Sequence, residues 1–280
     1  MRTHTRFAPS PTGRLHLGHA FSALQAHDVA RENGGIFTLR IEDIDGTRSR
    51  PEHVAAILAD LDWLGLAWDE PPVFQSQRLG LYQAALDRLR EMGLLYPCFC
   101  TRADIAASLS APHGPDGPLY PGTCRARAEP DLRRPHSWRL DMAAAVARTG
   151  PLTWHDAHAG TVVADPLSHG DVILARKDAP ASYHLAVTVD DAAQGITHVV
   201  RGADLFAATH VHRLLQPLLG LPTPAYRHHA LLTGPDGTRL AKRHGAPTLE
   251  ALRLAGEDGR ALADKLRKGE VPIGFGQREA

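Results

Sequence analysis

The order of apolar and polar positions at the start of the chain predicts a strand, a helix and a second strand. Residues 3–7 are short, contain Thr and Phe and end in a proline-rich turn, which is typical of a strand. Residues 17–32 form an amphipathic helix, which the turn Asn33-Gly34-Gly35 ends. Residues 36–41 alternate apolar and polar side chains, as a strand does. Such a strand–helix–strand unit predicts a parallel sheet, and ligands bind at the carboxyl ends of the strands of such sheets.

The same criteria predict further elements along the chain. They are helices over residues 51–64, 77–92 and 209–219, and strands over residues 183–190, 196–200 and near 228–232. Pro51 suits the first turn of its helix, and Gly93 suits the end of the next one. The chain after Gly256 is charged and glycine-rich, and we expect a helix and a loose tail there.

The pattern changes between about residue 96 and residue 176, where the apolar segments are shorter and proline and glycine accumulate. We interpret this stretch as an inserted α+β subdomain. The expected fold class is therefore α/β, with a nucleotide-binding domain made of residues 1–95 and 181–255, an insertion over residues 96–180 and a short C-terminal extension over residues 256–280.

The composition is that of an ordinary globular protein. The 280 residues include 43% hydrophobic ones, and the formal net charge is zero. A neutral chain argues against a broad basic surface that binds nucleic acid non-specifically. No apolar leader follows the N-terminus, and no stretch approaches the roughly 18 apolar residues of a membrane span. We therefore expect a cytoplasmic protein with no membrane partner.

A turn rich in proline and glycine leads directly into the first predicted helix. The segment reads Phe7-Ala-Pro-Ser-Pro-Thr-Gly-Arg-Leu-His-Leu-Gly-His19. His16 and His19 share one helix face, and Gly18 between them leaves room for a flat ligand near the backbone. Helix N-termini present unpaired N–H groups and partial positive charge, so this turn suits a phosphate group.

This segment resembles the HIGH signature of the class I aminoacyl-tRNA synthetases, in the form used by the glutamyl enzymes. The glutaminyl relatives usually carry Pro-Glu-Pro-Asn where this chain has Pro-Ser-Pro-Thr at residues 9–12, so glutamate is the expected amino acid. The resemblance implies a Rossmann-like catalytic domain that binds ATP with Mg²⁺, and catalytic roles for His16 and His19. It assigns to ATP, in this segment, Pro9, Ser10, Thr12, Gly13, His16, Gly18 and His19.

A second motif, Thr238-Arg-Leu-Ala-Lys-Arg-His244, follows a turn and a predicted strand. It resembles a degenerate KMSKS loop, whose lysine contacts the ATP phosphates in the family. The resemblance gives Lys242 the catalytic role and adds Arg239 to the ATP site. Arg239, Ala241 and Arg243 depart from the first lysine and both serines of the family motif.

Three segments look like the amino-acid pocket of the glutamyl enzymes: residues 40–48, 183–191 and 199–204. Glu42 can pair with the ammonium of glutamate, and arginines such as Arg6 and Arg201 can hold its side-chain carboxylate by a charged fork. Without the resemblance, Glu42 and Arg201 would be interpreted as surface ion-pair partners. The expected glutamate site consists of Arg6, Phe7, Ala8, Pro9, Ser10, Glu42, Tyr183 and Arg201.

The chain has 3 cysteines, and they lie close together at Cys98, Cys100 and Cys124. An odd count argues against a disulfide framework, and three thiolates suit a structural Zn²⁺, which takes four ligands. The alternative is three buried, reduced cysteines. His113 is the chemically conventional fourth ligand, whereas the Cys-x-Cys…Tyr-x₃-Cys arrangement of the short glutamyl relatives implies Tyr120.

A full glutamyl-tRNA synthetase continues past the KMSKS loop into a helical anticodon-binding half, whereas this sequence ends soon after Arg243. The sequence is therefore similar to the glutamyl-queuosine tRNA(Asp) synthetases, the short paralogs of bacteria. That resemblance implies a monomer that activates L-glutamate as glutamyl-adenylate and transfers it to queuosine at the wobble position of tRNA(Asp). The alternatives are a truncated or free-standing synthetase that charges tRNA(Glu) and a non-catalytic, zinc-stabilised tRNA-binding module.

Overall fold

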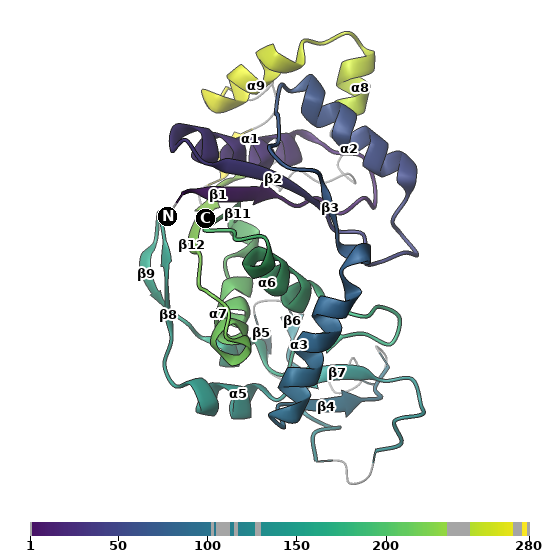
Figure 1. The fold of residues 1–280 in the computed structure, drawn as a ribbon. Coiled ribbons are helices and arrows are strands. Elements are labelled where there is room, and N and C mark those ends of the chain that lie inside the picture. Colours follow the sequence, from purple (N-terminus) through teal and green to yellow (C-terminus); the bar gives the residue numbers. More distant parts are fainter. Residues whose placement is uncertain are drawn as a thin grey trace.

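A mostly parallel sheet, in which a three-stranded and a four-stranded part lie side by side, runs through the middle of the molecule, with helices on both of its faces (Figure 1). The computed structural model describes residues 2–101, 104, 113–114, 117–126, 130–233, 247–270 and 276–278. Within these residues, no helix combines the length and the apolar character that crossing a membrane requires.

The N-terminal half of the sheet is the predicted strand–helix–strand unit with one more strand added. Strands β1 (His4–Phe7) and β2 (Ile36–Ile41) pair in parallel, and β2 pairs with the short β3 (Val73–Phe74). Helix α1 (Leu17–Glu32) connects the first two strands. Its turn into β2 needs glycine twice: Gly34 has a φ of 57°, and a Cβ on Gly35 would lie 2.3 Å from the carbonyl oxygen of Thr3. The sequence prediction of this unit is confirmed.

The other half of the sheet comes from the C-terminal part of the chain. Strand β11 (His198–Gly202) lies beside β1, where Thr197 N donates to the carbonyl of His4 at 3.0 Å. It pairs in parallel with β12 (Ala225–His229), which in turn meets the hairpin of β8 (Thr153–Asp156) and β9 (Gly160–Val163). The hairpin lies within residues 96–180 of the sequence, yet it extends the main sheet.

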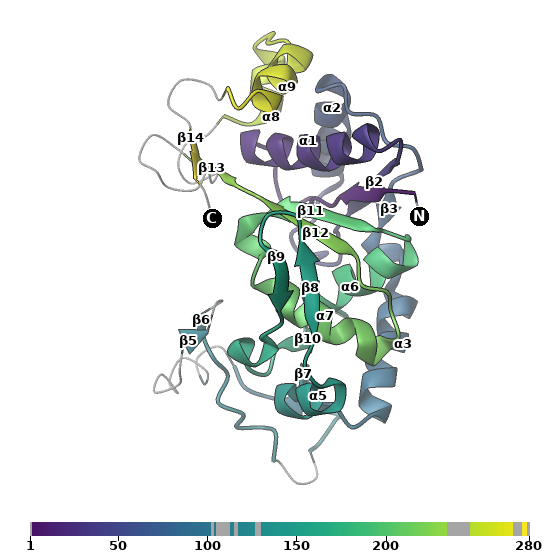
Figure 2. The same ribbon diagram turned by 90° about the vertical axis from the view of Figure 1, so that its left-hand side faces the viewer.

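Helices cover the two faces of the sheet and enclose two apolar cores (Figure 2). On one face α1 packs with α2 (Pro51–Trp63), α8 (Leu249–Leu254) and α9 (Gly259–Arg267). The second core is built by α3 (Leu79–Glu91), α5 (Met142–Thr149), α6 (Tyr183–Ala193) and α7 (Ala208–Leu219). Short 3₁₀ turns occupy Gln75–Gln77, Pro166–His169 and Ala203–Leu205.

A separate antiparallel sheet lies at the far end of α3 (Figure 1). Its strands are β4 (Leu95–Cys98), β7 (Ser137–Leu140) and β10 (Ile173–Ala175), in the order β10-β7-β4. Nearby, β5 (His113–Gly114) pairs with β6 (Gly117–Pro118). This sheet begins where the sequence pattern changes, and it carries the first of the three cysteines.

Two sequence predictions of elements are wrong. Residues 183–190 form most of helix α6 rather than a strand. The prediction failed because a short apolar run that is buried on nearly all sides lacks the periodicity that distinguishes a helix from a strand. The strand expected near residues 228–232 is divided at Ala230: β12 ends at His229, and β13 (Leu231–Thr233) pairs with β14 (Gly276–Arg278). Helix α8 was not predicted.

Candidate active site

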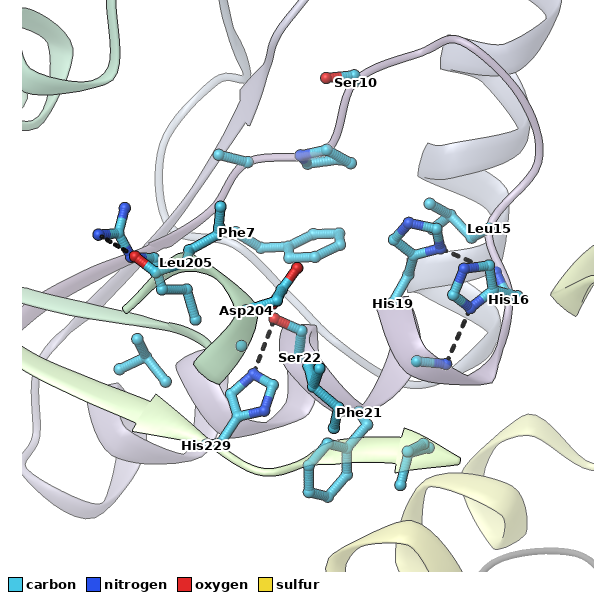
Figure 3. Close-up of a pocket in the computed structure, with 18 of the residues that line it drawn as sticks. Phe7, Ser10, Leu15, His16, His19, Phe21, Ser22, Asp204, Leu205 and His229 are labelled. Atoms are coloured by element: carbon cyan, nitrogen blue, oxygen red, sulfur yellow. Dashed lines mark hydrogen bonds between the residues drawn. The ribbon is translucent and has the colours of Figure 1, made fainter. Parts of the chain in front are cut away.

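A cavity of about 1010 Å³ opens where β1, β11 and β12 end, beside the first turn of α1 (Figure 3). Every described residue that the sequence suggested for ATP or glutamate lines it: Arg6, Phe7, Ala8, Pro9, Ser10, Thr12, Gly13, His16, Gly18, His19, Glu42, Tyr183 and Arg201. Arg239 and Lys242 lie outside the described residues. The fold therefore joins segments that are far apart in the sequence into one site at the carboxyl ends of parallel strands.

The two histidines cap the helix that starts in the cavity. His16 Nδ1 accepts from the backbone N–H of Gly18, and His19 Nδ1 accepts from the backbone N–H of His16, both at 3.1 Å. A ring nitrogen that accepts carries no proton, so each neutral imidazole holds its proton on Nε2. The first turn of α1 thus combines the partial positive charge of a helix N-terminus with two imidazole N–H donors.

The backbone of Gly18 lies close to the ring of His16. A Cβ there would lie 3.0 Å from Cε1 and 3.2 Å from Nδ1 of His16, so the ring would have to shift slightly. The ring centroids of His16 and His19 are 3.9 Å apart, and Figure 3 shows the two rings together on one side of the cavity, with Phe7 and Asp204 across from them. Glycine at position 18 therefore lets the His16 ring sit close to the backbone without a shift.

Arg201 reaches the other part of the cavity with an unneutralised positive charge. Its guanidinium donates to the hydroxyl of Tyr183 at 3.1 Å and to the hydroxyl of Thr209 at 2.7 Å. Further bonds go to the carbonyl of Leu205 and to the imidazoles of His212 and His228. No carboxylate among the described residues lies within ion-pair distance of it. A buried guanidinium held by neutral groups alone attracts an anion.

Arg6 also lines the cavity but, unlike Arg201, it pairs with a carboxylate. Its Nε and Nη2 donate to the two carboxylate oxygens of Asp191, at 2.9 and 3.3 Å. Arg40, which is fully buried, also donates to Asp191 at 2.9 Å. Burial alone would raise the pKa of Asp191, yet Arg6 and Arg40 hold it below its ordinary value. The charge of Arg6 is therefore compensated within the protein.

Glu42 lies at the edge of this buried charge network. Its Oε1 is 3.7 Å from Nε of Arg40, and its side chain is 11% exposed. Burial raises the pKa of Glu42 to about 7, even though Arg40 and Arg6 favour the ionised form. A carboxylate with such a pKa faces the cavity and can accept an ammonium group.

The structure adds residues that sequence reasoning missed. Ser22 and His229 line the cavity, together with Asp204 from the expected segment 199–204, and Ser22 Oγ lies 3.1 Å from Nε2 of His229 (Figure 3). Ser22 follows His16 and His19 at helical spacing, so its place on the same face was predictable. Nothing in the sequence around His229 marked it, because β12 reaches the cavity only through the pairing of β11 with β12.

The three cysteines converge in the antiparallel sheet region, away from the cavity. The Sγ atoms of Cys98, Cys100 and Cys124 all lie within 4.8 Å of one another, and those of Cys100 and Cys124 are 3.7 Å apart. The hydroxyl of Tyr120 lies 3.5 Å from Sγ of Cys100. The side chain of His113 is outside what the structure describes. Thiolate sulfurs at about 2.3 Å from a tetrahedral Zn²⁺ have similar separations, so the three cysteines could supply three of its four ligands.

Comparison with known proteins defines the class. The family model of the class I tRNA synthetases (E and Q), catalytic domain, matches residues 2–268. A crystal structure of a glutamate tRNA ligase from Elizabethkingia meningosepticum, in complex with its amino acid, superposes with a TM-score of 0.74 at 29% identity, over 88% of this chain and 53% of that one. The chain thus spans about half the length of that ligase. It is a class I tRNA synthetase catalytic domain.

The curated relatives are more specific. The glutamyl-Q tRNA(Asp) synthetase of Rhodobacter capsulatus is 51% identical over 267 residues, which cover 90% of this chain and 95% of that protein. The protein of the same name from Symbiobacterium thermophilum is 49% identical over 263 residues, covering 90% of this chain and 81% of that protein. The chain belongs to the glutamyl-Q tRNA(Asp) synthetase family.

Proposed function

We propose that this protein activates L-glutamate with ATP and transfers the glutamyl group to queuosine at the wobble position of tRNA(Asp). One observation carries the proposal: a single cavity joins the histidine-capped start of α1 to Arg201, a buried arginine that no carboxylate of the described residues neutralises. The anion-binding helix terminus suits a nucleoside triphosphate, and the second anion site beside it suits an amino acid with a carboxylate side chain. The names of the relatives add the tRNA and its modified base.

The first step joins the two substrates in this cavity. An α-carboxylate oxygen of glutamate attacks the α-phosphorus of ATP, the bond to the β-phosphate breaks, and pyrophosphate leaves. The N–H groups of His16 and His19 stabilise the negative charge that develops on the phosphates. Mg²⁺ accompanies the ATP, and the roles of Lys242 and Arg239 rest on the sequence motif alone. In the second step a hydroxyl of queuosine attacks the adenylate carbonyl and AMP leaves.

The amino-acid site then follows from charge. Glu42 pairs with the ammonium of glutamate, Arg201 pairs with its side-chain carboxylate, and Tyr183 adds its hydroxyl. Arg6 forms part of the cavity wall, and because Asp191 compensates its charge, its contribution is to the shape of the site. An uncompensated guanidinium favours glutamate over glutamine, since an amide cannot neutralise it.

The cysteine cluster is proposed to hold one structural Zn²⁺ per chain. Cys98, Cys100 and Cys124 supply three ligands, and Tyr120 is the fourth in preference to His113, since its hydroxyl lies beside the cluster. The ion would order the cysteine-bearing part of residues 96–180, the stretch that we propose as an inserted subdomain that meets the tRNA, although its β8–β9 hairpin belongs to the main sheet. We further propose that the protein acts as a monomer in the cytoplasm, where its substrates ATP and tRNA occur.

Transfer of radiolabelled glutamate to purified tRNAs tests the function. The panel contains tRNA(Asp) with queuosine, tRNA(Asp) without it, and tRNA(Glu). We expect label only on the queuosine-containing tRNA(Asp), and the label should survive removal of the 3′ terminus. Label on the 3′ end of tRNA(Glu) would contradict the proposal and indicate a charging enzyme, and no transfer to any tRNA would indicate a binding module.

A further inference from the structure

Arg201 is connected through a histidine to a carboxylate on a distant strand. Nε of Arg201 donates to Nε2 of His228 at 3.2 Å, and Nδ1 of His228 lies 2.8 Å from Oδ2 of Asp156. An arginine can only donate, so Nε2 of His228 must be unprotonated and its proton must be on Nδ1, from which it donates to Asp156. The chain of contacts therefore defines a neutral imidazole in one tautomer.

The surroundings keep this imidazole in place. Asp156 is 1% exposed, and its carboxylate also accepts from the backbone N–H groups of His158, Ala159 and His228. The His228 ring is enclosed by aromatic side chains, with ring-centroid distances of 5.8 Å to Trp154, 5.1 Å to Phe206 and 6.0 Å to Tyr226. Burial and the nearby Arg201 lower the pKa of His228 to about 4.

A second imidazole, that of His212, also accepts a hydrogen bond from the guanidinium of Arg201. Nδ1 of His212 accepts from Arg201 at 3.3 Å, which leaves the proton on Nε2, and that atom lies 3.2 Å from Nδ1 of His184. Burial, with Arg201 next in importance, lowers the pKa of His212 well below its ordinary value. Two neutral rings therefore orient Arg201, whereas Asp191 orients Arg6 with a charge.

We infer that Asp156 and His228 are positioning residues that orient Arg201 for the side-chain carboxylate of the amino-acid substrate without neutralising it. A carboxylate placed directly on Nε would orient the guanidinium equally well, but it would compete with the substrate for the same charge. The imidazole keeps the anion of Asp156 one ring away and presents only a lone pair. The inference rests on the proposed function, because it takes glutamate as the ligand of this cavity.

Two substitutions of His228 separate its two bonds. His228→Asn keeps a donor toward Asp156 but loses the acceptor for Arg201, whereas His228→Gln places an amide oxygen near the position of Nε2. Titration calorimetry with L-glutamate and separately with ATP gives the affinities. We expect His228→Asn to weaken glutamate binding by roughly 10-fold to 100-fold, as loss of a hydrogen bond to a charged group does. ATP binding should change less than about twofold, and His228→Gln should restore glutamate binding to within about threefold of wild type.

Two more variants complete the test. Asp156→Asn offers an N–H to Nδ1 and so moves the imidazole proton to Nε2, against Arg201; glutamate binding should fall as it does in His228→Asn. His155→Asn changes the exposed neighbour on the same strand and should leave both affinities unchanged. Glutamate affinity at the wild-type level in folded His228→Asn would overturn the inference, and so would equal losses for glutamate and ATP in both His228 variants.

A spectroscopic readout needs no folded variant of Asp156 and no activity. In ¹⁵N-histidine-labelled wild-type protein, with His228 assigned by its absence from His228→Gln, we expect a neutral ring protonated at Nδ1 across pH 6–8. A ring protonated at Nε2, or an imidazolium, would overturn the inference. Failure of the wild-type protein to bind glutamate, with the expected tautomer present, would instead count against the proposed function.

Discussion

Two arginines in one cavity show how the surroundings of a residue decide its use. Arg6 and Arg201 are both about 5% exposed or less and both line the cavity. The carboxylate of Asp191 faces the first, whereas hydroxyls, a carbonyl and neutral imidazoles surround the second. Of these two arginines, Arg201 is the one that no described carboxylate faces, so its charge is left for a ligand, and burial in a low-dielectric site strengthens its attraction for an anion.

Replacement of Arg201 should therefore act on glutamate and not on ATP. In Arg201→Ala we expect the KM for glutamate to rise by about 30-fold or more, which corresponds to loss of a buried charge pair of about 2 kcal/mol or more, while the KM for ATP changes little. Steady-state pyrophosphate exchange, in the presence of tRNA, measures both. Arg176→Ala, which removes an exposed arginine, is the control. Equal increases of the two KM values would contradict the role of Arg201.

We expect Glu42 to make glutamate binding depend on pH. Its pKa in the folded protein is about 7, raised from 4.5 chiefly by burial, so the folded state holds the proton more tightly than the unfolded state. Stability from this group is therefore present at low pH and is lost as the pH rises from about 4.5 through 7. Binding of an ammonium needs the ionised form, whose fraction falls about tenfold per pH unit below the pKa. We expect the Kd for glutamate to be about tenfold higher at pH 6 than at pH 8.

Calorimetric titrations at several pH values, with Glu42→Gln as the reference, check this dependence. The variant cannot ionise, so its weaker affinity should be the same at pH 6 and pH 8. A pH dependence that persists in Glu42→Gln would assign the titration to another group.

At the scale of elements, helix α1 combines structure and chemistry in its first turn. His16 and His19 use Nδ1 to satisfy backbone N–H groups that every helix N-terminus leaves open, and they keep Nε2–H on the side of the ring that faces away from those bonds. Each ring therefore has one structural nitrogen and one nitrogen that is proposed to be catalytic.

Substitutions can separate the two nitrogens of His19. His19→Asn keeps an acceptor for the N–H of His16 but has no group at Nε2, whereas His19→Ala loses both. We expect both variants to slow adenylate formation by about 10²–10³-fold. Only His19→Ala should lose about 1 kcal/mol of stability through the helix cap. Single-turnover pyrophosphate release and urea unfolding give the two quantities, and near-normal rates in His19→Asn would remove the catalytic role.

The cysteine cluster, to which β4 contributes Cys98, is the second feature at this scale with its own chemistry. If the cluster holds Zn²⁺, the purified protein should contain about one zinc per chain, and Cys98→Ser should lose it. The cavity residues are outside this region, so ATP binding should persist in Cys98→Ser. Metal analysis of Tyr120→Phe and His113→Ala then identifies the fourth ligand: we expect weaker zinc retention in the first variant only. Unchanged zinc in Cys98→Ser would contradict the site.

At the scale of the whole molecule, a buried charge network joins elements that are more than 100 residues apart in the sequence. Asp191 on α6 accepts from Arg6 on β1 and from Arg40 on β2, and Asp190 accepts from Tyr82 and Gln75 at 2.8 Å each. These bonds connect the N-terminal strands to the helix that follows the antiparallel sheet. The network therefore ties Arg6, which lines the cavity, to α6.

Removal of one charge from this network should be costly. Asp191→Asn leaves two buried guanidinium groups without their shared anion, and we expect a loss of about 3–5 kcal/mol of unfolding free energy. Asp178→Asn breaks an exposed pair with Arg176 and should cost less than about 1 kcal/mol. Urea unfolding at pH 7 compares the two variants, and similar costs for both would mean that the buried network is not a stabilising feature.

The sequence by itself determined the features that depend on near neighbours along the chain. The strand–helix–strand unit over residues 4–41, the histidines at the start of its helix and the spacing of the cysteines all follow from local patterns. Site residues on β1 and in the following turn were identifiable because the motif is contiguous.

Only the tertiary structure decided what depends on segments far apart in the sequence. Residues 183–190 form a helix that the sequence did not reveal. Because the helix is buried on nearly every side, its residues show no alternation of apolar and polar positions with helical period. The different charge states of Arg6 and Arg201, and the contacts of Arg201 with His228 and Asp156, exist only once β1, β8, β11 and β12 lie together. Periodicity records which face of an element is buried, but it does not record which side chain from elsewhere will meet that face.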